Sequence, residues 1–202
     1  SKDAYLEILD LNYNNIERKL VSCNECGHHY RLPSLSNNEV NRLYQHFRDW
    51  SLTNEAADDY FERITSYCKN ESENHKKIEW LDKYISPFMQ KGGSILDIGC
   101  GGGVFLYTFK KLYPKWMLFG VEPTTQFADL ASRRNNAEVR NCEYSSGLFP
   151  HKFDLIILNQ VLEHVLDPIE FLKGISIDLT NSSFIYLEVP DTKDLEELPT
   201  EH

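Results

Sequence analysis

The stretch that decides the fold is SILDIGCGGG, at residues 94–103. Its apolar run is broken by the carboxylate of Asp97 and ends in four glycines within five positions, at Gly99 and at 101–103. A short apolar run predicts a buried strand, and glycines after it let a turn adopt positive φ angles and let a ligand approach the main chain. Four glycines are more than a tight turn requires, so we interpret the stretch as a strand followed by a ligand-binding turn.

Strand patterns and helix patterns alternate after this turn. Strands are expected at 94–100, 116–123, 137–143, from 153, and at 183–190, and helices at 104–113, 125–136 and 167–175. Asp167 is expected to cap the last of these helices, with Pro168 at its first position. Five strands with intervening helices predict an open, mainly parallel α/β sheet covered by helices on both faces. Ligands of such sheets bind beyond the carboxyl ends of the strands.

The chain divides into two regions of different character. Residues 1–72 are polar, and we expect a small, partly helical N-terminal region there, with a helical lid beginning at 37–50. Residues 73–202 are expected to form the α/β domain. Between the two lies an apolar stripe from Ile78 to Phe88, which predicts a helix whose last turn Pro87 strains.

Composition narrows the class of partner. A formal net charge of −10 over 202 residues works against broad attraction to nucleic acid or to an anionic membrane surface. The sequence contains neither an apolar run near the roughly 20 residues of a membrane helix nor a signal-peptide pattern. We therefore expect a cytoplasmic protein that acts on a small molecule. Its five cysteines are expected to be reduced thiols.

Three residues near the glycines discriminate between cofactors. A dinucleotide fingerprint counted from Gly99 needs a third glycine at position 104, which is Val104. Asp97 is a carboxylate inside an apolar strand, where a ligand ammonium would help to satisfy it. Glu122 ends the second strand, 23 residues after Gly99, at the spacing typical of an acid that binds ribose hydroxyls. The pattern favours an adenosine-containing ligand other than a dinucleotide.

Four segments, ILDIGCGGG, GVEPT, FDLIILNQVLEHVLDP and FIYLEVPD, together resemble the class I S-adenosylmethionine-dependent methyltransferases of the small-molecule branch. The resemblance covers residues 75–191. It implies a Rossmann-like sheet, S-adenosylmethionine as cofactor, and methyl transfer to a small-molecule acceptor. The β-hairpin that ends the family's sheet is missing from the sequence, so we expect the domain to be incomplete at its C-terminus.

The resemblance also implies which residues bind the cofactor. These are Asp97, Gly99, Cys100 and Gly101 at the methionine portion, Glu122 at the ribose, Pro123 and Thr124 toward the adenine, Cys142 and Glu143 at the adenine ring or its amine, and Asn159 and Gln160, which close the pocket.

A methyl acceptor with an acidic proton needs a base, and histidine titrates near neutral pH. His164 lies just past the fourth strand, on the rim where the acceptor should meet the methyl group, with Glu163 beside it. The alternative is that His164 is a loop residue that only shapes the site. Tyr144, His151 and His202 are weaker candidates for the base.

The N-terminal region contains a C-x-x-C-G motif at residues 23–27. Cys23 and Cys26 could present two thiolates to a zinc ion, with further ligands among His28, His29 and Cys68 or upstream. Two ordinary thiols in a turn and a redox pair are the alternatives. The motif resembles the zinc-binding segment before the methyltransferase domain of some bacterial sugar methyltransferases, which suggests a sugar or sugar nucleotide as acceptor.

Two other functional classes remain open from the sequence. A NAD(P)-dependent oxidoreductase would share the acid at Glu122, although Val104 opposes it. A non-catalytic protein that binds the cofactor and assembles through the zinc motif would keep the fold. The sequence leaves the oligomeric state open.

Overall fold

The computed structural model describes residues 19–27, 29–32 and 55–191. The helix predicted at 37–50 and His202 lie outside these residues. The chain forms two compact units, Thr53–Val189 and a smaller one that combines Ser1–Leu52 with Pro190–His202. Each unit is described by itself.

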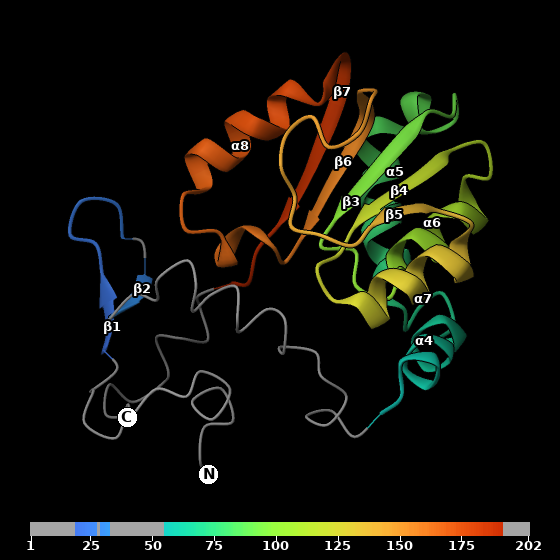
Figure 1. The fold of residues 1–202 in the computed structure, drawn as a ribbon, viewed down its shortest axis with the longest axis horizontal. Helices are drawn as coiled ribbons and strands as arrows, with labels where there is room; N and C mark the ends of the chain where they lie inside the picture. The colour runs from blue at the N-terminus through green and yellow to red at the C-terminus, as the bar shows by residue number, and fades with distance from the viewer. Residues whose placement is uncertain (1–18, 28, 33–54, 192–202) are drawn as a thin grey trace. The chain divides into compact units, whose positions relative to one another are not determined.

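The larger unit is built on a five-stranded sheet in the order β5-β4-β3-β6-β7, with every neighbouring pair parallel (Figure 1). Its strands are β3 (Ser94–Ile98), β4 (Met117–Val121), β5 (Glu138–Arg140), β6 (Phe153–Asn159) and β7 (Leu179–Glu188). This confirms the predicted Rossmann-like α/β sheet. The strand order reverses between β3 and β6, and ligands of open parallel sheets bind where this reversal occurs.

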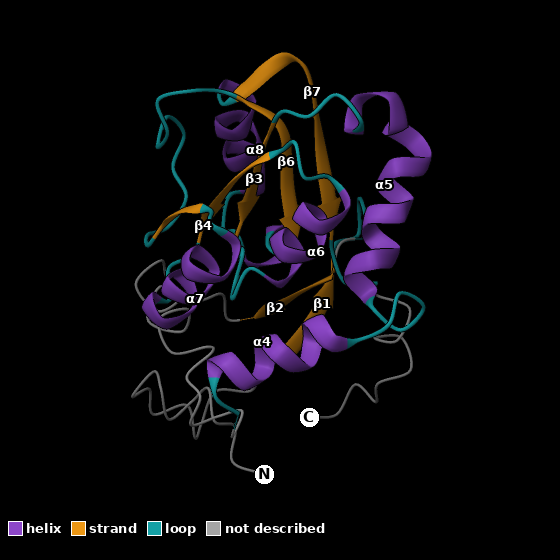
Figure 2. Ribbon diagram, turned by 90° about the vertical axis from the view of Figure 1, so that its right-hand side faces the viewer, coloured by secondary structure: helices purple, strands orange, loops and turns teal. Residues whose placement is uncertain are grey.

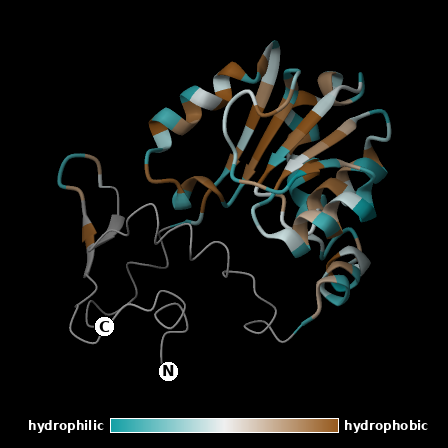
Figure 3. Cartoon of the chain, in the orientation of Figure 1, coloured by the Kyte–Doolittle hydropathy of each residue, from teal (hydrophilic) through white to brown (hydrophobic). Residues whose placement is uncertain are grey.

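Helices cover both faces of the sheet (Figures 1 and 2). The helices are α4 (Ala57–Ser66), α5 (Glu73–Met89), α6 (Val104–Leu112), α7 (Thr125–Asn135) and α8 (Pro168–Ile177). One buried cluster joins side chains of α5, α6 and α7 to one face of the sheet, and the other joins the opposite face to α8. The central strands are accordingly apolar along most of their length (Figure 3).

Two predictions that rest on a capping residue or a proline are confirmed, the start of α8 and the distortion in the last turns of α5. The Asp167 side chain accepts a hydrogen bond from the backbone N–H of Glu170 at 3.0 Å, and Pro168 begins α8. In α5, Ile85 leaves helical geometry (φ −130°, ψ 28°) two residues before Pro87. The proline ring would clash with the preceding turn of a regular helix, which explains the kink.

Strand β5 is shorter than the predicted 137–143. It ends at Arg140 because the side chain of Asn141 then bonds the main chain of the neighbouring strand's end. Its Nδ2 donates to the carbonyls of Glu122 and Pro123, both at 2.9 Å.

Trp116, which directly precedes β4, anchors α5 to the sheet. Its side chain is fully buried, and the indole N–H donates to the carbonyl of Met89 at 2.8 Å. The ring packs edge-on against Phe88 and Phe109, so one residue joins α5 to α6. Burial of a ring of this size contributes about 3 kcal/mol to folding.

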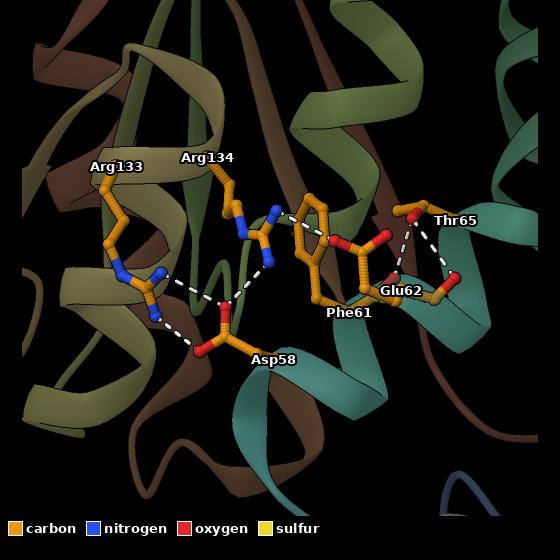
Figure 4. Close-up of polar contacts among 6 residues, drawn as sticks. All are labelled: Asp58, Phe61, Glu62, Thr65, Arg133 and Arg134. Carbon is orange, nitrogen blue, oxygen red and sulfur yellow. Dashed lines mark hydrogen bonds and ion pairs between the residues drawn. The ribbon is translucent and has the colours of Figure 1, made fainter.

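Helix α4 docks onto α6 and α7 through the aromatic side chains of Tyr60 and Phe61 and a set of ion pairs, which Figure 4 shows. Phe61 is 2% exposed and meets the ring of Tyr107 edge-on. Asp58 accepts hydrogen bonds from both Arg133 and Arg134. These hydrogen bonds outweigh a small opposing effect of burial and lower the pKa of Asp58 to about 2.

In the smaller unit, β1 (Lys19–Ser22) and β2 (His29–Leu32) form an antiparallel hairpin. The C-x-x-C-G motif forms its turn, which closes with a 2.9 Å hydrogen bond from the N–H of Gly27 to the carbonyl of Cys23. None of the helices in the described residues is long and apolar enough to cross a membrane.

Candidate functional site

The predicted cofactor residues meet at the carboxyl edge of the sheet. Ile98 is aligned with Val121 on β4 and with Leu158 on β6. The residues that follow Ile98, Val121 and Leu158 are Gly99, Glu122 and Asn159, respectively. These three therefore form a row across the carboxyl edge of the sheet. Because strand side chains alternate between faces, this row lies on the face that α5 and α6 cover.

The glycine turn is held tightly at both ends. Gly99 has φ 70°, and its N–H donates to the carbonyl of Val121 at 2.8 Å. A Cβ at Gly99 would lie 2.9 Å from Val161, and one at Gly103 (φ 77°) would lie 2.3 Å from Asn135 in α7. Gly99 and Gly103 are therefore needed so that the turn can pack closely against Val161 and against α7. The sequence alone did not distinguish this packing role from access for a ligand.

Glu122 is tied to the main chain through both carboxylate oxygens. Oε2 accepts from the N–H of Gly101 and Oε1 from the N–H of Thr124, each at 2.9 Å. The residue is 6% exposed. Because each carboxylate oxygen has a second lone pair, the group can still accept from a ligand hydroxyl, and its orientation is fixed beforehand.

Asp97 and Cys100 flank Gly99 on the buried side of the turn. Asp97 is 2% exposed and Cys100 is 6% exposed. The Cys100 thiol lies in contact distance of Gly120 on β4, where a Cβ would come within 2.8 Å of its sulfur. Cys100 thus packs against the neighbouring strand β4. Asp97 lies in β3, two residues before Gly99.

The residues predicted near the adenine follow β4 and β5. Pro123 and Thr124 lead into α7, and Thr124 is its first capping position. Cys142 is partly buried against the cluster under α8, whereas Glu143 is exposed. Asn141, which the sequence analysis did not single out, fixes this corner through its two hydrogen bonds to the end of β4. An asparagine directly after a strand is a turn signal that could have identified it.

The far end of the row contains polar contacts that the sequence analysis also missed. Gln160 has φ 55°, an uncommon conformation for a residue with a side chain, and its N–H donates to the carbonyl of Glu188 at 2.9 Å. Lys77 of α5 donates to Asn159 Oδ1 at 2.7 Å and pairs with Glu188. No local pattern indicates these contacts, because each joins separate elements.

His164 ends the 3-10 turn η2 (Leu162–His164), which follows β6 beyond the carboxyl edge. Its side chain is 40% exposed, and Nε2 lies 3.7 Å from Glu163 Oε1. The histidine is therefore on the side of the sheet where an acceptor would enter, in reach of solvent.

Two weaker candidates for the base are placed elsewhere or engaged. His151 precedes β6, at the opposite edge of the sheet, and packs against the rings of Phe119 and Phe153. Tyr144 donates to Asp178 at 2.6 Å. Burial and this hydrogen bond raise the pKa of Tyr144 far above its ordinary value, which makes it a poor base.

Each of the five cysteines is free. The pKa of Cys23 lies below its ordinary value because backbone N–H groups of Cys26 and Glu25, and the Cys26 thiol, donate to its sulfur. Within the described residues, no group of three or more histidine, cysteine or acidic side chains is arranged to hold a metal ion. His28 and the side chain of His29 lie outside them, so the zinc site stays a prediction.

Comparison with known proteins adds a family to this geometry. The model of a family described as "Methyltransferase domain" matches residues 70–202. An uncharacterised methyltransferase of Schizosaccharomyces pombe is 30% identical over 126 residues, which are 56% of this chain and 45% of that protein. The ubiquinone biosynthesis O-methyltransferase of Actinobacillus pleuropneumoniae is 24% identical over 133 residues, 57% of this chain and 56% of that enzyme.

Among solved structures, the plantazolicin methyltransferase BpumL, in complex with a pentazolic desmethylPZN analog and SAH, has a TM-score of 0.57 at 23% identity. The alignment covers 78% of this chain and 61% of that one. At this identity the likeness establishes the fold. The chain spans about half the length of the curated relatives it matches.

Proposed function

The chain belongs to the methyltransferase domain family, and we propose that it transfers a methyl group from S-adenosylmethionine to a small-molecule acceptor. The observation that carries the proposal is the pairing of the glycine turn with Glu122, whose carboxylate is fixed beside it by the N–H groups of Gly101 and Thr124. The family match favours this function over the NAD(P)-dependent oxidoreductase.

The cofactor's ribose hydroxyls would donate to Glu122, since each of its carboxylate oxygens keeps a second lone pair. Its adenine would extend toward β5, past Pro123 and Thr124 to Cys142 and Glu143. Its methionine portion would extend the other way. The residues proposed for that portion are Asp97, Gly99, Cys100 and Gly101 along the turn, with Asn159 and Gln160 at the end of β6.

Methyl transfer from a sulfonium needs little chemical assistance. A lone pair of the acceptor forms the new bond to the methyl carbon as the carbon–sulfur bond breaks, and the sulfur keeps that electron pair in the neutral thioether. Most of the rate then comes from holding the acceptor in line with the methyl group. An acceptor hydroxyl or ammonium also loses a proton, for which we propose His164 as the base.

For the identity of the methyl acceptor, we propose a sugar or a sugar nucleotide. Such an acceptor is supported by the resemblance around Cys23 and Cys26, two thiols that lie in the turn between β1 and β2. Zinc bound there would be a structural ion, since cysteine thiolates suit zinc. It would complete the turn and take no part in methyl transfer.

Two measurements test the activity. Calorimetric titration with S-adenosylhomocysteine and with NADH should give binding of the first alone, and binding of NADH alone would contradict the proposal. Mass spectrometry should then detect a gain of one methyl group in an acceptor from a panel of amino sugars, sugar nucleotides, phenols and amines incubated with S-adenosylmethionine.

The catalytic proposal needs its own variant. His164→Asn should lower turnover by about 100-fold, within the range of a lost general base, and leave affinity for S-adenosylhomocysteine within twofold. Glu170→Gln, which removes one exposed charge on α8 without touching His164, is the control and should change turnover little. Equal turnover in His164→Asn and the wild type would remove the histidine from the mechanism.

A further inference from the structure

Side chains from three elements form one bonded cluster at the carboxyl ends of β6 and β7. Asn159 and Glu188 are aligned neighbours on these strands, and Lys77 reaches them from α5. The Lys77 ammonium donates to Asn159 Oδ1 at 2.7 Å and lies 2.8 Å from Glu188 Oε1. The side chain of Lys77 is 15% exposed and that of Glu188 26%. Such limited exposure makes the ion pair stronger than one in open solvent.

The carboxylate of this cluster, Glu188, is poorly suited to remove a proton from an acceptor. Partial burial tends to raise the pKa of Glu188, but hydrogen bonds from Lys77 and Tyr186 outweigh it, so the pKa lies below its ordinary value. A carboxylate of that kind is a weak base at neutral pH. Tyr186 donates to its other oxygen, Oε2, which fixes the carboxylate in place. The cluster is therefore built to hold a geometry.

The geometry it holds is the orientation of the Asn159 carboxamide. An ammonium has only donors, so the amide must present its oxygen to Lys77. The Nδ2 donor group then points to the other side of the carboxamide. Glu188 neutralises the charge of Lys77, so the amide is oriented without a lone cation at this position.

The position of Asn159 indicates which part of the ligand it meets. Glu122, Gly99 and Asn159 stand in a row on adjacent strands, about 4.8 Å apart from one to the next. With the ribose at Glu122, the methionine portion crosses Gly99 toward Asn159. That portion carries an ammonium and a carboxylate. Asp97 suits the ammonium, and the carboxylate requires a hydrogen-bond donor.

We propose that Lys77 and Glu188 are positioning residues that orient the Asn159 carboxamide so that Nδ2 donates to the carboxylate of the cofactor's methionine portion. This inference rests on the proposed function, because it takes S-adenosylmethionine as the ligand. It goes further by assigning a task to Lys77, which lies outside the four segments that carry the family resemblance, and to Glu188, which lies in the last of them and had no role there.

The test compares two ligands by calorimetry on the full chain. S-adenosylhomocysteine carries the carboxylate, whereas 5′-methylthioadenosine has the same adenosine and lacks the amino-acid portion. Lys77→Met, which keeps an unbranched side chain and removes the ammonium donor, should weaken binding of S-adenosylhomocysteine about 10-fold, as expected for a hydrogen bond to a charged group. Binding of 5′-methylthioadenosine should stay within twofold.

Further variants separate positioning from a general structural effect. Asn159→Ala should weaken S-adenosylhomocysteine by a similar factor, and the double variant by no more than Asn159→Ala alone, because Lys77 acts through the amide. Lys77→Arg should recover part of the affinity. Lys76→Met, one position away on α5, is the matched control and should bind both ligands as the wild type does. Glu188→Gln gives a second route if Lys77→Met fails to fold.

The outcomes are distinct. Equal weakening of both ligands by Lys77→Met, or additive effects in the double variant, would overturn the positioning role while leaving the proposed function intact. If the wild-type chain bound neither ligand, the proposed function would be wrong, and this inference with it.

Discussion

Two glycines of the larger unit offer a matched pair for testing the glycine turn. Gly103 and Gly147 have nearly the same positive φ, 77° and 75°. A Cβ at Gly147 would meet no atom within 4 Å, whereas one at Gly103 would lie 2.3 Å from Asn135 Nδ2 and 3.0 Å from Ala131 Cα. Replacing each by alanine therefore applies the same backbone strain and adds a steric clash at Gly103 alone.

The magnitudes follow from these two contributions. The left-handed conformation should cost an alanine about 1 kcal/mol at either position. The clash at Gly103 should add about 2 kcal/mol, in the range of overpacked cores. It cannot be relieved cheaply, because Asn135 is 7% exposed and its Nδ2 donates to the carbonyls of Gly103 and Ala131.

Thermal unfolding measures the difference. For a chain of this size the loss of 1 kcal/mol lowers Tm by about 3 °C, so Gly147→Ala should lose about 3 °C and Gly103→Ala about 9 °C. Because α7 would have to move, Gly103→Ala should also weaken S-adenosylhomocysteine, which Gly147→Ala should bind normally. Equal Tm values for the two variants would refute the reasoning, since they would mean that α7 yields to the new methyl group at no cost.

Four further outcomes are expected. Trp116→Phe should lower the free energy of unfolding by about 2 kcal/mol in urea titrations, because it leaves the buried carbonyl of Met89 without its donor. Glu122→Gln should weaken S-adenosylhomocysteine about 10-fold in calorimetry, with the exposed Glu170→Gln as the control. The stability advantage of the wild type over Asp58→Asn should be fully present above about pH 4 and vanish toward pH 2, because the folded-state pKa is lowered to about 2 from 3.8; an advantage unchanged at pH 2 would contradict the Asp58 ion pairs. Elemental analysis should find zinc in the wild-type chain prepared without chelator and none in Cys23→Ser, and a metal-free wild type would count against the zinc motif.

The sequence predicted the parts of the fold that local chemistry specifies. Asp167 and Pro168 fix the start of α8 through a cap and a ring that suit a first turn, and Pro87 forces the break at Ile85. Apolar runs identified the five strands, because a parallel sheet buries both faces of its central strands. The predicted end of β5 was wrong because the side chain of Asn141 donates to the carbonyls of Glu122 and Pro123, which follow the neighbouring strand β4.

The polar geometry of the site was less accessible to prediction. Lys77 and Asn159 are 82 residues apart, and no periodicity relates them. A lysine in a helix is ordinarily expected on the exposed face, so no sequence pattern singled out Lys77, whose side chain is in fact 15% exposed. The pair becomes visible only when the parallel register of β6 and β7 places Asn159 beside Glu188 and α5 crosses that face.

The arrangement of the turn bears on how a ligand would bind there. Glu122 is fixed by two main-chain donors, Gly99 is bonded to the end of β4, and Gly103 is packed against α7. Binding to such an edge would not have to order the groups proposed to recognise the ribose, which removes a cost that flexible sites carry. The acceptor side differs, because His164 and Glu163 lie exposed on a short turn beyond β6. Differences in acceptor among proteins with this sheet should therefore arise from that side, while the cofactor edge can stay the same.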